Sequence, residues 1–457
     1  MRLLKFIFSK LFICIFLIAA LCAAITFLCV YVHSVLPAAA AVALAYAIGL
    51  AAALSLLFGE SPSEFKCAWL IAIVALPVCG AVLYFLSYLN RCQRCDRTVS
   101  LPQATCFSYE YFNDGAPFLD RLISLVSSAK NQVYLEFYII SKGHIWGALR
   151  REIENALKRG VKIKIIYDAL GSAYRAPLKD FKKLKEGGAE IKVFNKLRPL
   201  PVSRLNFRDH RKIAVIDDEA VFLGGVNVAD EYANLSSPHG HWKDGGALFF
   251  GQIAAVYSRI FLNLFEDAEF DFKHVYGKSG NIILTPVADE PECRGSVCED
   301  DLARAICAAE QRIYVFTPYL CMGDKLHDAV SAAARRGTDV KIIIPHVPDK
   351  KFTYAITKTY CEKLIKSGVQ VYTYTPGFMH FKGVVCDDVA LLGSYNFDFR
   401  SMRLNYECGV WGGEELAGDI AKDFTNCLAL CERYEPKKRG ALARAAGKLL
   451  CLFAPLV

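Results

Sequence analysis

Charged residues are missing from two long stretches near the start of the chain. Leu11–Gly59 contains no Asp, Glu, Lys or Arg, and a second charge-free run covers Cys67–Asn90. A helix that crosses a bilayer needs roughly 20 apolar residues. The first stretch therefore predicts two spans with a turn near His33–Pro37, and the second predicts one more. We expect residues 1–98 to form a membrane anchor with two to three transmembrane helices.

The remainder of the chain alternates short β-branched or aromatic runs with helical patterns, and the same order of elements occurs twice. In the first copy a helix at Leu119–Ala129 is followed by strands at Val133–Tyr138, Gly160–Ile166 and Glu190–Phe194. In the second copy a helix at Leu302–Gln311 is followed by strands at Ile313–Tyr319, Gly337–Ile344 and Val369–Tyr374. Such alternation is typical of α/β architecture with largely buried strands. We expect two similar halves, residues 99–280 and 281–435, packed about a pseudo-twofold axis.

The formal net charge of the 457 residues is +8, and the basic residues are clustered. The clusters are Arg91, Arg94 and Arg97; Lys196, Arg198, Arg204 and Arg208; and Lys437, Lys438, Arg439, Arg444 and Lys448. Basic groups beside a membrane attract anionic lipid, each by about 1 kcal/mol; the alternative is a solvated face that only aids solubility. Residues 436–457 add apolar residues at helical spacing, which predicts an interfacial amphipathic tail, with a core-packing helix as the alternative.

The 18 cysteines are scattered along the chain without a paired framework. Such a distribution suits free thiols in a reducing compartment. The Cys92-x-x-Cys95 pair has no second pair at zinc spacing, so it does not indicate a metal site. We therefore expect a multi-pass protein of the cell membrane with its catalytic domain in the cytoplasm.

Both halves carry the pattern His-x-Lys-x4-Asp followed by Gly-[Gly/Ser]-x-Asn. The residues are His210, Lys212, Asp217 and Asn227 in the first half and His380, Lys382, Asp387 and Asn396 in the second. One such motif arises by chance at roughly a few per cent in a chain of this length, but two at the same place in a repeat do not. A lone histidine in a strand is more often structural than catalytic. The duplication therefore indicates a shared active site.

The residue types in the motif fit phosphoryl transfer. Period two places each histidine on the same strand face as its lysine, so the two halves would bring two imidazoles and two ammonium groups together. Lysines and the amides of Asn227 and Asn396 would bind the phosphate oxygens, so that no metal or cofactor is expected. One histidine would attack phosphorus while the other donates a proton to the leaving alcohol. Asp217 and Asp387, at strand ends, are expected to serve as hydrogen-bonding framework residues.

Several segments outside the bare motif resemble bacterial cardiolipin synthases of the phospholipase D superfamily, and the resemblance covers nearly the whole chain. These segments are Cys67–Tyr84, Tyr167–Ser172, Leu205–Lys212, Asp230–Tyr232, Thr317–Tyr319 and Pro376–His380. The resemblance implies transfer of a phosphatidyl group between two phosphatidylglycerol molecules without metal. It also implies that His210 is the nucleophile, that His380 is the acid/base, and that Asp244 and Glu407 orient the histidines.

Four alternatives stay open at this point. The same residues would serve a phospholipase D hydrolase or a phosphatidyltransferase with another acceptor, such as serine. A membrane-tethered nuclease is possible because basic loops follow nucleic acid backbones; the apolar anchor and the lack of interleaved aromatic and basic residues argue against a nucleic acid partner. A catalytically inactive lipid-binding module is the non-enzymatic alternative, and both intact motifs oppose it. The oligomeric state is left open.

Overall fold

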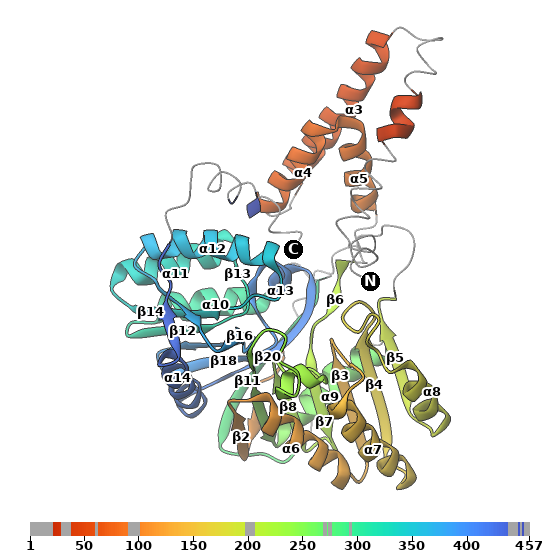
Figure 1. Cartoon of the computed structure of the whole chain (residues 1–457), viewed down its shortest axis with the longest axis vertical. Coiled ribbons are helices and arrows are strands. Elements are labelled where there is room, and N and C mark those ends of the chain that lie inside the picture. The colour runs from red at the N-terminus through yellow and green to blue at the C-terminus, as the bar shows by residue number, and fades with distance from the viewer. Residues whose placement is uncertain are drawn as a thin grey trace. The chain divides into compact units, whose positions relative to one another are not determined.

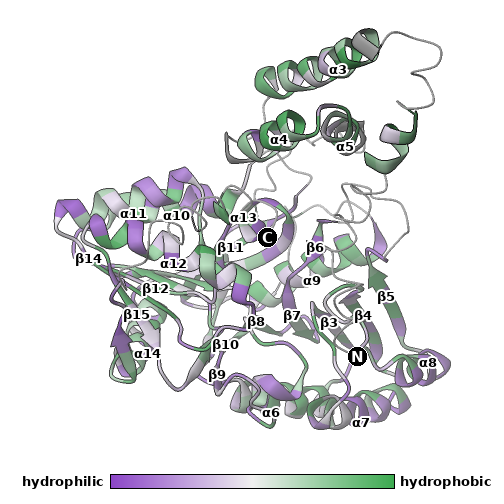
Figure 2. Cartoon of the chain, turned by 45° about the horizontal axis from the view of Figure 1, so that its top comes forward, coloured by the Kyte–Doolittle hydropathy of each residue, from purple (hydrophilic) through white to green (hydrophobic). Residues whose placement is uncertain are grey.

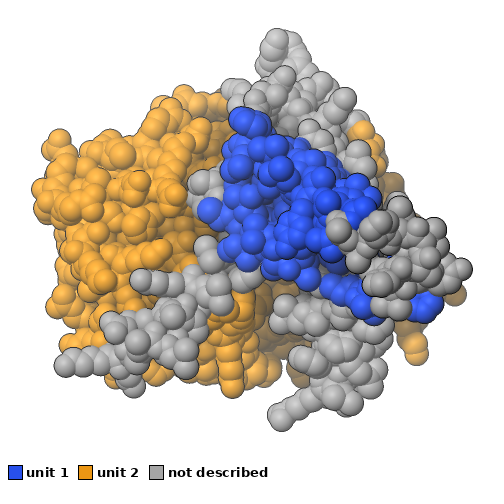
Figure 3. Space-filling view, turned by 90° about the horizontal axis from the view of Figure 1, so that it is seen from above, with its two compact units in different colours: residues 1–92, 200–204 blue, residues 93–199, 205–457 orange. Residues whose placement is uncertain are grey.

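A computed structural model describes residues 22–28, 38–59, 63–89, 101–196, 206–267, 272, 277–291, 295–436, 447 and 450–451. The chain divides into two compact units, one of residues 1–92 and 200–204 and the other of residues 93–199 and 205–457 (Figure 3). The turn expected near His33–Pro37 and the cysteine pair at Cys92 and Cys95 lie outside the described residues.

The first unit contains the apolar helices α3 (Ala38–Phe58), α4 (Ser63–Ala75) and α5 (Pro77–Leu89). In α3, residues Ala40–Phe58 are long and apolar enough to cross a membrane, and Figure 2 shows the helix hydrophobic along most of its length. The second charge-free run does not form one long span, because Pro77 lacks a backbone N–H and begins a new helix after Leu76. Within the described part of the chain, α3 is the one helix of spanning length. Most of the first predicted span, before the turn near His33–Pro37, lies outside the described residues.

The first half of the second unit is built on a seven-stranded sheet with the strand order β2-β10-β8-β7-β3-β4-β5. The strands are β2 (Ser108–Phe112), β3 (Gln132–Phe137), β4 (Lys162–Asp168), β5 (Glu190–Phe194), β7 (Lys212–Ile216), β8 (Ala220–Gly224) and β10 (Gly246–Phe250). Three helices cover its outer face: α6 (Gly115–Ser128), α7 (His144–Lys158) and α8 (Leu178–Glu186). Strands β3, β4 and β5 run parallel and the others pair antiparallel (Figure 1).

The second half repeats this arrangement in the order β1-β11-β20-β18-β17-β12-β14-β15-β21. The strands are β1 (Ala104–Cys106), β11 (Ile282–Asp289), β12 (Arg312–Phe316), β14 (Asp339–Pro345), β15 (Gln370–Tyr374), β17 (Gly383–Cys386), β18 (Val389–Gly393), β20 (Asn405–Gly412) and β21 (Cys431–Arg433). Its outer helices are α10 (Val297–Ala308), α11 (Asp324–Arg336) and α12 (Lys351–Lys366). The matching orders confirm the predicted α/β fold with two similar halves.

The sequence boundary between the halves is crossed by strand pairing, and β1 is the first example. Residues Ala104–Cys106 belong to the first half along the chain, but β1 pairs antiparallel with β11 and so extends the sheet of the second half. The two sheets are therefore interlocked, and the division at residues 280 and 281 stays a prediction.

Local sequence signals explain where several helices begin and end. Asp114 caps α6 by accepting a hydrogen bond from the backbone N–H of Ala116 at 3.0 Å. Ser296 caps α10 in the same way through the N–H of Glu299, and such caps contribute about 1 kcal/mol each. Gly337 ends α11 with φ +100°, a conformation that favours glycine.

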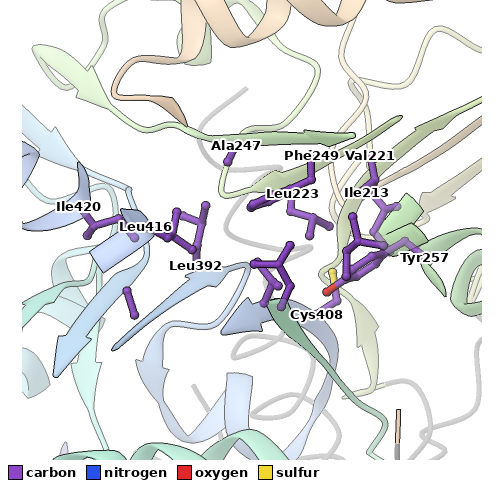
Figure 4. Packing of buried hydrophobic residues seen from close by; sticks show 14 of the residues in the cluster. Ile213, Val221, Leu223, Ala247, Phe249, Tyr257, Leu392, Cys408, Leu416 and Ile420 are labelled. Carbon is purple, nitrogen blue, oxygen red and sulfur yellow. The ribbon is translucent and has the colours of Figure 1, made fainter. Parts of the chain in front are cut away.

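An apolar core lies between the two sheets, with helices α9 (Gln252–Glu266) and α14 (Glu414–Leu428) packed in it. Figure 4 shows side chains from both halves pointing into this core; the labelled residues are Ile213, Val221, Leu223, Ala247, Phe249, Tyr257, Leu392, Cys408, Leu416 and Ile420. Burying each large apolar side chain contributes roughly 1.5–3 kcal/mol. The halves are therefore held together by a continuous core as well as by strand exchange.

Beyond Pro436, the C-terminal tail is described at only three residues. Of these, Leu450 and Cys451 pack against the apolar cluster of the second half, a contact that favours the core-packing alternative at this point. The remaining residues of the predicted amphipathic tail lie outside the described part of the chain, as does most of the basic loop between Lys196 and Arg208.

Candidate active site

His210 is positioned by a strand from the opposite half. It follows the two-residue strand β6 (Arg208–Asp209), which pairs in parallel with the start of β20. The backbone N–H of His210 donates to the carbonyl of Tyr406 at 2.9 Å. The second half therefore fixes where the first-half histidine enters the site.

His380 is positioned in the reciprocal way. It follows β16 (Gly377–Met379), which pairs in parallel with β9 (His241–Lys243) of the first half. The backbone N–H groups of His380 and Phe381 both donate to the carbonyl of Lys243, at 2.8 and 2.9 Å. Each motif is thus held by main-chain hydrogen bonds from the other half.

The two histidines contact carboxylates across the halves. The Nδ1 atom of His210 lies 2.9 and 3.0 Å from the two carboxylate oxygens of Glu407, and the Nδ1 atom of His380 lies 2.5 Å from Oδ2 of Asp244. A carboxylate accepts hydrogen bonds, so each Nδ1 carries the hydrogen and each Nε2 is the nitrogen left for chemistry. The structure therefore pairs the first-half histidine with the second-half carboxylate and vice versa.

The motif lysines are almost fully buried, with 2% of each residue exposed. Lys212 donates to the carbonyl of His210 and Lys382 to the carbonyl of His380; the ammonium of Lys382 also lies 2.7 Å from Nδ1 of His380. Burial lowers the pKa of Lys212 to about 8 and that of Lys382 to about 7, although nearby carboxylates oppose the effect. Each lysine therefore releases its proton more readily than usual, and the neighbouring carboxylates favour its charged form.

Burial dominates the titration of the four paired groups. It lowers the pKa of both histidines well below the usual value, and the charges of Lys212 and Lys382 lower these values further. Burial also raises the pKa of Asp244 and Glu407 to about 7. His210 itself contributes to the lowered pKa of His380. An anionic phosphate bound there would offset the lysine charges and favour protonation of one histidine.

The two motif asparagines lie inside the network around the histidines. The amide oxygen of Asn227 accepts from the backbone N–H of Ile139 at 3.0 Å, and its Nδ2 donates to the hydroxyl of Tyr232 at 2.7 Å. Asn396 donates its backbone N–H to the Ser401 hydroxyl at 3.1 Å. Their expected contact with a phosphate stays a prediction.

The motif aspartates lie at the far ends of their strands from the histidines. Asp217 accepts hydrogen bonds from three successive backbone N–H groups at 2.7–2.9 Å, those of residues 130–132. Asp387 accepts from residues 310–312 in the same way, at 2.8–2.9 Å. Both have positive φ, +57° and +51°. Each aspartate therefore forms hydrogen bonds to the segment that joins the end of a helix to the start of a central strand.

A family model described as "Cardiolipin synthase, PLD-like domain" matches residues 122–237 and 302–428, more than half of the chain. The chain belongs to this family. A second model, "Phospholipase D-nuclease N-terminal", matches residues 47–87, which include most of α3. Together with the apolar character of α3, this match identifies a membrane-associated member of the phospholipase D superfamily.

Relatives of the cardiolipin synthase family cover most of the chain. An uncharacterised protein of Streptococcus mutans is 31% identical over 80% of this chain and 82% of its own length. The major cardiolipin synthase ClsA of Bacillus subtilis is 35% identical over 72% of this chain and 70% of its own length. A cardiolipin synthase of Listeria welshimeri is 34% identical over 66% of this chain and 64% of its own length.

Two solved structures share the fold at low sequence identity. Phosphatidylserine synthase of Haemophilus influenzae has a TM-score of 0.59 and 16% identity, covering 78% of this chain and 95% of its own. Polyphosphate kinase of Porphyromonas gingivalis has a TM-score of 0.51 and 13% identity, covering 75% of this chain and 52% of its own. At such identities the likeness concerns the fold alone.

Sequence reasoning missed several residues that support the family motif. The hydroxyl groups of Ser394 and Ser401 and the amide of Asn405 all donate to Glu407. The ring of Tyr138 lies edge-on to His210 at 5.1 Å, and that of Tyr232 lies edge-on to His380 at 5.3 Å. A signal existed, because Ser394 replaces the second glycine of the repeated motif and Tyr138 is the last residue of a predicted strand.

Proposed function

We propose that this enzyme transfers a phosphatidyl group from one phosphatidylglycerol molecule to another, giving cardiolipin and glycerol. The observation that carries the proposal is the crossed arrangement of His210 with Glu407 and His380 with Asp244. The names of the Bacillus and Listeria relatives support cardiolipin as the product. A phospholipid is accordingly the partner, and the membrane is its source.

In the first step, Nε2 of His210 attacks phosphorus while the bond from phosphorus to the glycerol oxygen breaks. His380 gives its proton to that oxygen, so glycerol leaves and a phosphatidyl-histidine remains. In the second step, a hydroxyl of the second phosphatidylglycerol gives its proton to His380 and attacks phosphorus, and the bond between phosphorus and His210 breaks. The ammonium groups of Lys212 and Lys382 stabilise the negative oxygens in both steps.

An asymmetry between the two carboxylates supports this assignment of roles. Glu407 accepts hydrogen bonds from three side chains in addition to His210, whereas the hydrogen bond that the structure gives Asp244 besides His380 comes from the backbone N–H of Gly245 at 2.8 Å. Donors that stabilise a carboxylate make it a weaker partner for an imidazolium. The less satisfied Asp244 therefore stabilises a protonated His380 better, which suits the proton donor.

The finer membrane topology belongs to the same proposal. We infer several membrane spans in residues 1–98 and a cytoplasmic catalytic domain in residues 99–435, followed by a basic tail. The apolar helix α3 and the free cysteines of the described residues support this topology. Labelling of single engineered cysteines from each side of sealed vesicles measures it directly.

Product analysis tests the proposed reaction. Purified full-length protein in detergent micelles of phosphatidylglycerol should form cardiolipin and glycerol in equal amounts, and EDTA should not stop the reaction. Phosphatidic acid as the sole product would identify a hydrolase, and phosphatidylserine formed with added serine would identify another acceptor. With radiolabelled donor, His380→Ala should accumulate a covalent lipid adduct that acid releases, whereas His210→Ala should form none.

A further inference from the structure

Four segments of the chain surround the two histidines at the same strand ends. Strand β7 begins two residues after His210 and pairs there with the last residue of β3; β17 begins three residues after His380 and pairs there with the last residue of β12. The rings of Tyr138 and Tyr232 lie 5.1 and 5.3 Å from the imidazoles of His210 and His380. We call the site rim the segments that follow β3, β4, β8 and β14, which are residues 138–143, 169–179, 225–240 and 346–352.

Contacts join these segments into one surface. The backbone N–H of Ser141 donates to the carbonyl of Val228 at 2.9 Å, and Arg175 forms an ion pair with Glu231. The backbone N–H groups of residues 346 and 347 donate to the carbonyl of Gly377, the first residue of β16, at 3.2 and 3.3 Å. Strand β16 pairs with β9, which directly follows segment 225–240. Both halves therefore contribute to one continuous rim.

Exposed large apolar side chains are concentrated on the rim. The structure describes nine of them in the second unit, and five belong to the rim: Tyr174, Leu178, Leu235, Val347 and Phe352. Tyr174 is the most exposed of the nine, at 93%. Single exposed apolar side chains are common on soluble domains, but a group of them around a site is typical of a binding surface.

Unpaired positive charge accompanies these apolar side chains. Four exposed rim lysines form no ion pair within the described part of the chain: Lys142, Lys179, Lys350 and Lys351. The three rim acids all have partners. Asp230 accepts hydrogen bonds from two backbone N–H groups at 3.0 Å, and Glu231 pairs with Arg175. Asp349 accepts a hydrogen bond from the hydroxyl of Tyr319 at 2.6 Å. The rim therefore combines apolar groups with uncompensated cations.

We propose that the site rim inserts into the surface of an anionic lipid bilayer. Its apolar side chains lie at the boundary between headgroups and acyl chains, about 5–10 Å deep, and its lysines lie among the lipid phosphates, where the negative surface attracts each of them. A second copy of this chain is the alternative occupant, but a contact between two rims places the same lysines against one another. The inference goes beyond the proposed reaction, because an inserted rim delivers lipid to the histidines whichever alcohol accepts the phosphatidyl group.

Fluorescence quenching by bromine on the acyl chains tests the insertion. Full-length protein is reconstituted in vesicles of brominated phosphatidylcholine with phosphatidylserine, and Leu235→Trp and Phe352→Trp each place a new fluorophore on the rim, one in each half. The fluorescence that each new tryptophan adds to that of the wild-type protein should be lost, relative to vesicles without bromine. If the added fluorescence at either position survives bromine, water or protein covers the rim there and the inference is overturned.

Ile283→Trp is the matched control. Ile283 lies on β11, six residues before Asp289, which pairs with Glu407, and thus about 20 Å from the site at the rise of a strand. Its side chain is also exposed, at 62%, so the fluorescence of a tryptophan there should be unchanged by bromine. Phosphatidylserine is not the donor of the proposed reaction, so the quenching result holds even if the enzyme forms no cardiolipin.

The degree of quenching in the Leu235→Trp protein also measures the ratio of inserted to free rims. Lys142→Gln and Lys350→Gln should each lower this ratio by about fivefold, the effect of one lysine near an anionic surface, whereas Lys142→Arg and Lys350→Arg should keep it. Lys130→Gln, which removes an exposed lysine before the opposite end of β3, should leave the ratio unchanged. An unchanged ratio in Lys142→Gln and Lys350→Gln, or an equal fall in Lys130→Gln, overturns the inference.

Discussion

Gly225 and Ser394 occupy equivalent positions in the two motifs, and each lies against the carboxylate that holds a histidine. A side-chain carbon at Gly225 would collide with the carboxylate of Asp244, whereas the hydroxyl of Ser394 donates to Glu407. Ser394 therefore gives Glu407 a hydrogen bond that Gly225, at the equivalent position, does not give Asp244. Glycine at the first position leaves Asp244 in contact with His380.

Gly225→Ala should slow the enzyme without unfolding it. The Asp244 side chain can rotate away from the new methyl group, but it then leaves Nδ1 of His380, 2.5 Å away in the wild-type structure. A misplacement of about 1 Å at a catalytic group costs up to about 100-fold, so we expect kcat to fall by roughly 10- to 100-fold. The measurement is cardiolipin formation at saturating phosphatidylglycerol, together with the melting temperature.

Gly418→Ala in α14 is the matched control, because outside its chain neighbours and the backbone of its own helix no atom lies within 4 Å of the place that its new methyl group would occupy. It should retain wild-type kcat and gain up to about 1 kcal/mol of stability from the better helix propensity of alanine. Wild-type kcat in Gly225→Ala would show that the contact between Asp244 and His380 does not limit catalysis.

At the scale of elements, the motif aspartates hold strands rather than substrate. Burial raises the pKa of Asp387, but three backbone N–H groups outweigh it, so that the pKa lies below the usual 3.8. A folded-state pKa below the unfolded value means that the stabilisation is present above the unfolded pKa and is lost as the pH falls through the folded one. The turn between β17 and β18 should therefore weaken in acid.

Asp387→Asn should lower the melting temperature at pH 7 by about 2–4 °C, since an amide oxygen is a weaker acceptor than a carboxylate. The difference from wild type should shrink as the pH falls below about 3.8. Thermal denaturation from pH 7 to pH 3 measures both effects. Asp388→Asn is the control, because the side chain of Asp388 is 78% exposed. An equal fall in melting temperature in the two variants would contradict a stabilising role of the Asp387 hydrogen bonds.

The repeated elements were predictable because each depends on local sequence. Strand β5 has the predicted bounds Glu190–Phe194, and β15 begins one residue after the predicted Val369. The crossing of carboxylates between the halves was not predictable, because it depends on β6 and β9. These strands have two and three residues, too few for a hydrophobic period to show. Their partners are chosen by tertiary packing, which a single sequence does not reveal.

In the N-terminal anchor, composition predicted the kind of segment but not how it divides into helices. Composition predicted an apolar N-terminal region, and α3 with the match to residues 47–87 confirms a membrane-associated segment. Composition did not predict that the second apolar run divides at Pro77, although proline restricts the residue before it and removes a donor. Charge-free length alone therefore overestimated the spans in the described residues.

At the scale of the whole molecule, a buried ion pair joins the halves beside the site. The ammonium of Lys243 lies 3.0 and 2.8 Å from the two carboxylate oxygens of Asp423 on α14, and their side chains are 5% and 4% exposed. The hydroxyl of Tyr111, on the first sheet, donates to the same carboxylate at 2.9 Å. The carbonyl of Lys243 accepts a hydrogen bond from the backbone N–H of His380. The ion pair that fixes Lys243 therefore also helps to fix the position of His380.

Lys243→Met should destabilise the protein by about 3–5 kcal/mol, because it leaves the Asp423 carboxylate buried without its counter-ion. Lys243→Met with Asp423→Asn should cost less than the sum of the two single changes, since the second removes the unpaired charge. Denaturant unfolding measures the free energy of unfolding of the three variants, and cardiolipin formation should fall as this free energy falls.

Lys182→Met serves as the control. Lys182 lies 3.9 Å from Glu186 with both side chains mostly exposed, and such pairs contribute at most about 1 kcal/mol. Additive losses in the double variant would mean that Lys243 and Asp423 do not stabilise one another and that the halves are joined by their apolar core and exchanged strands.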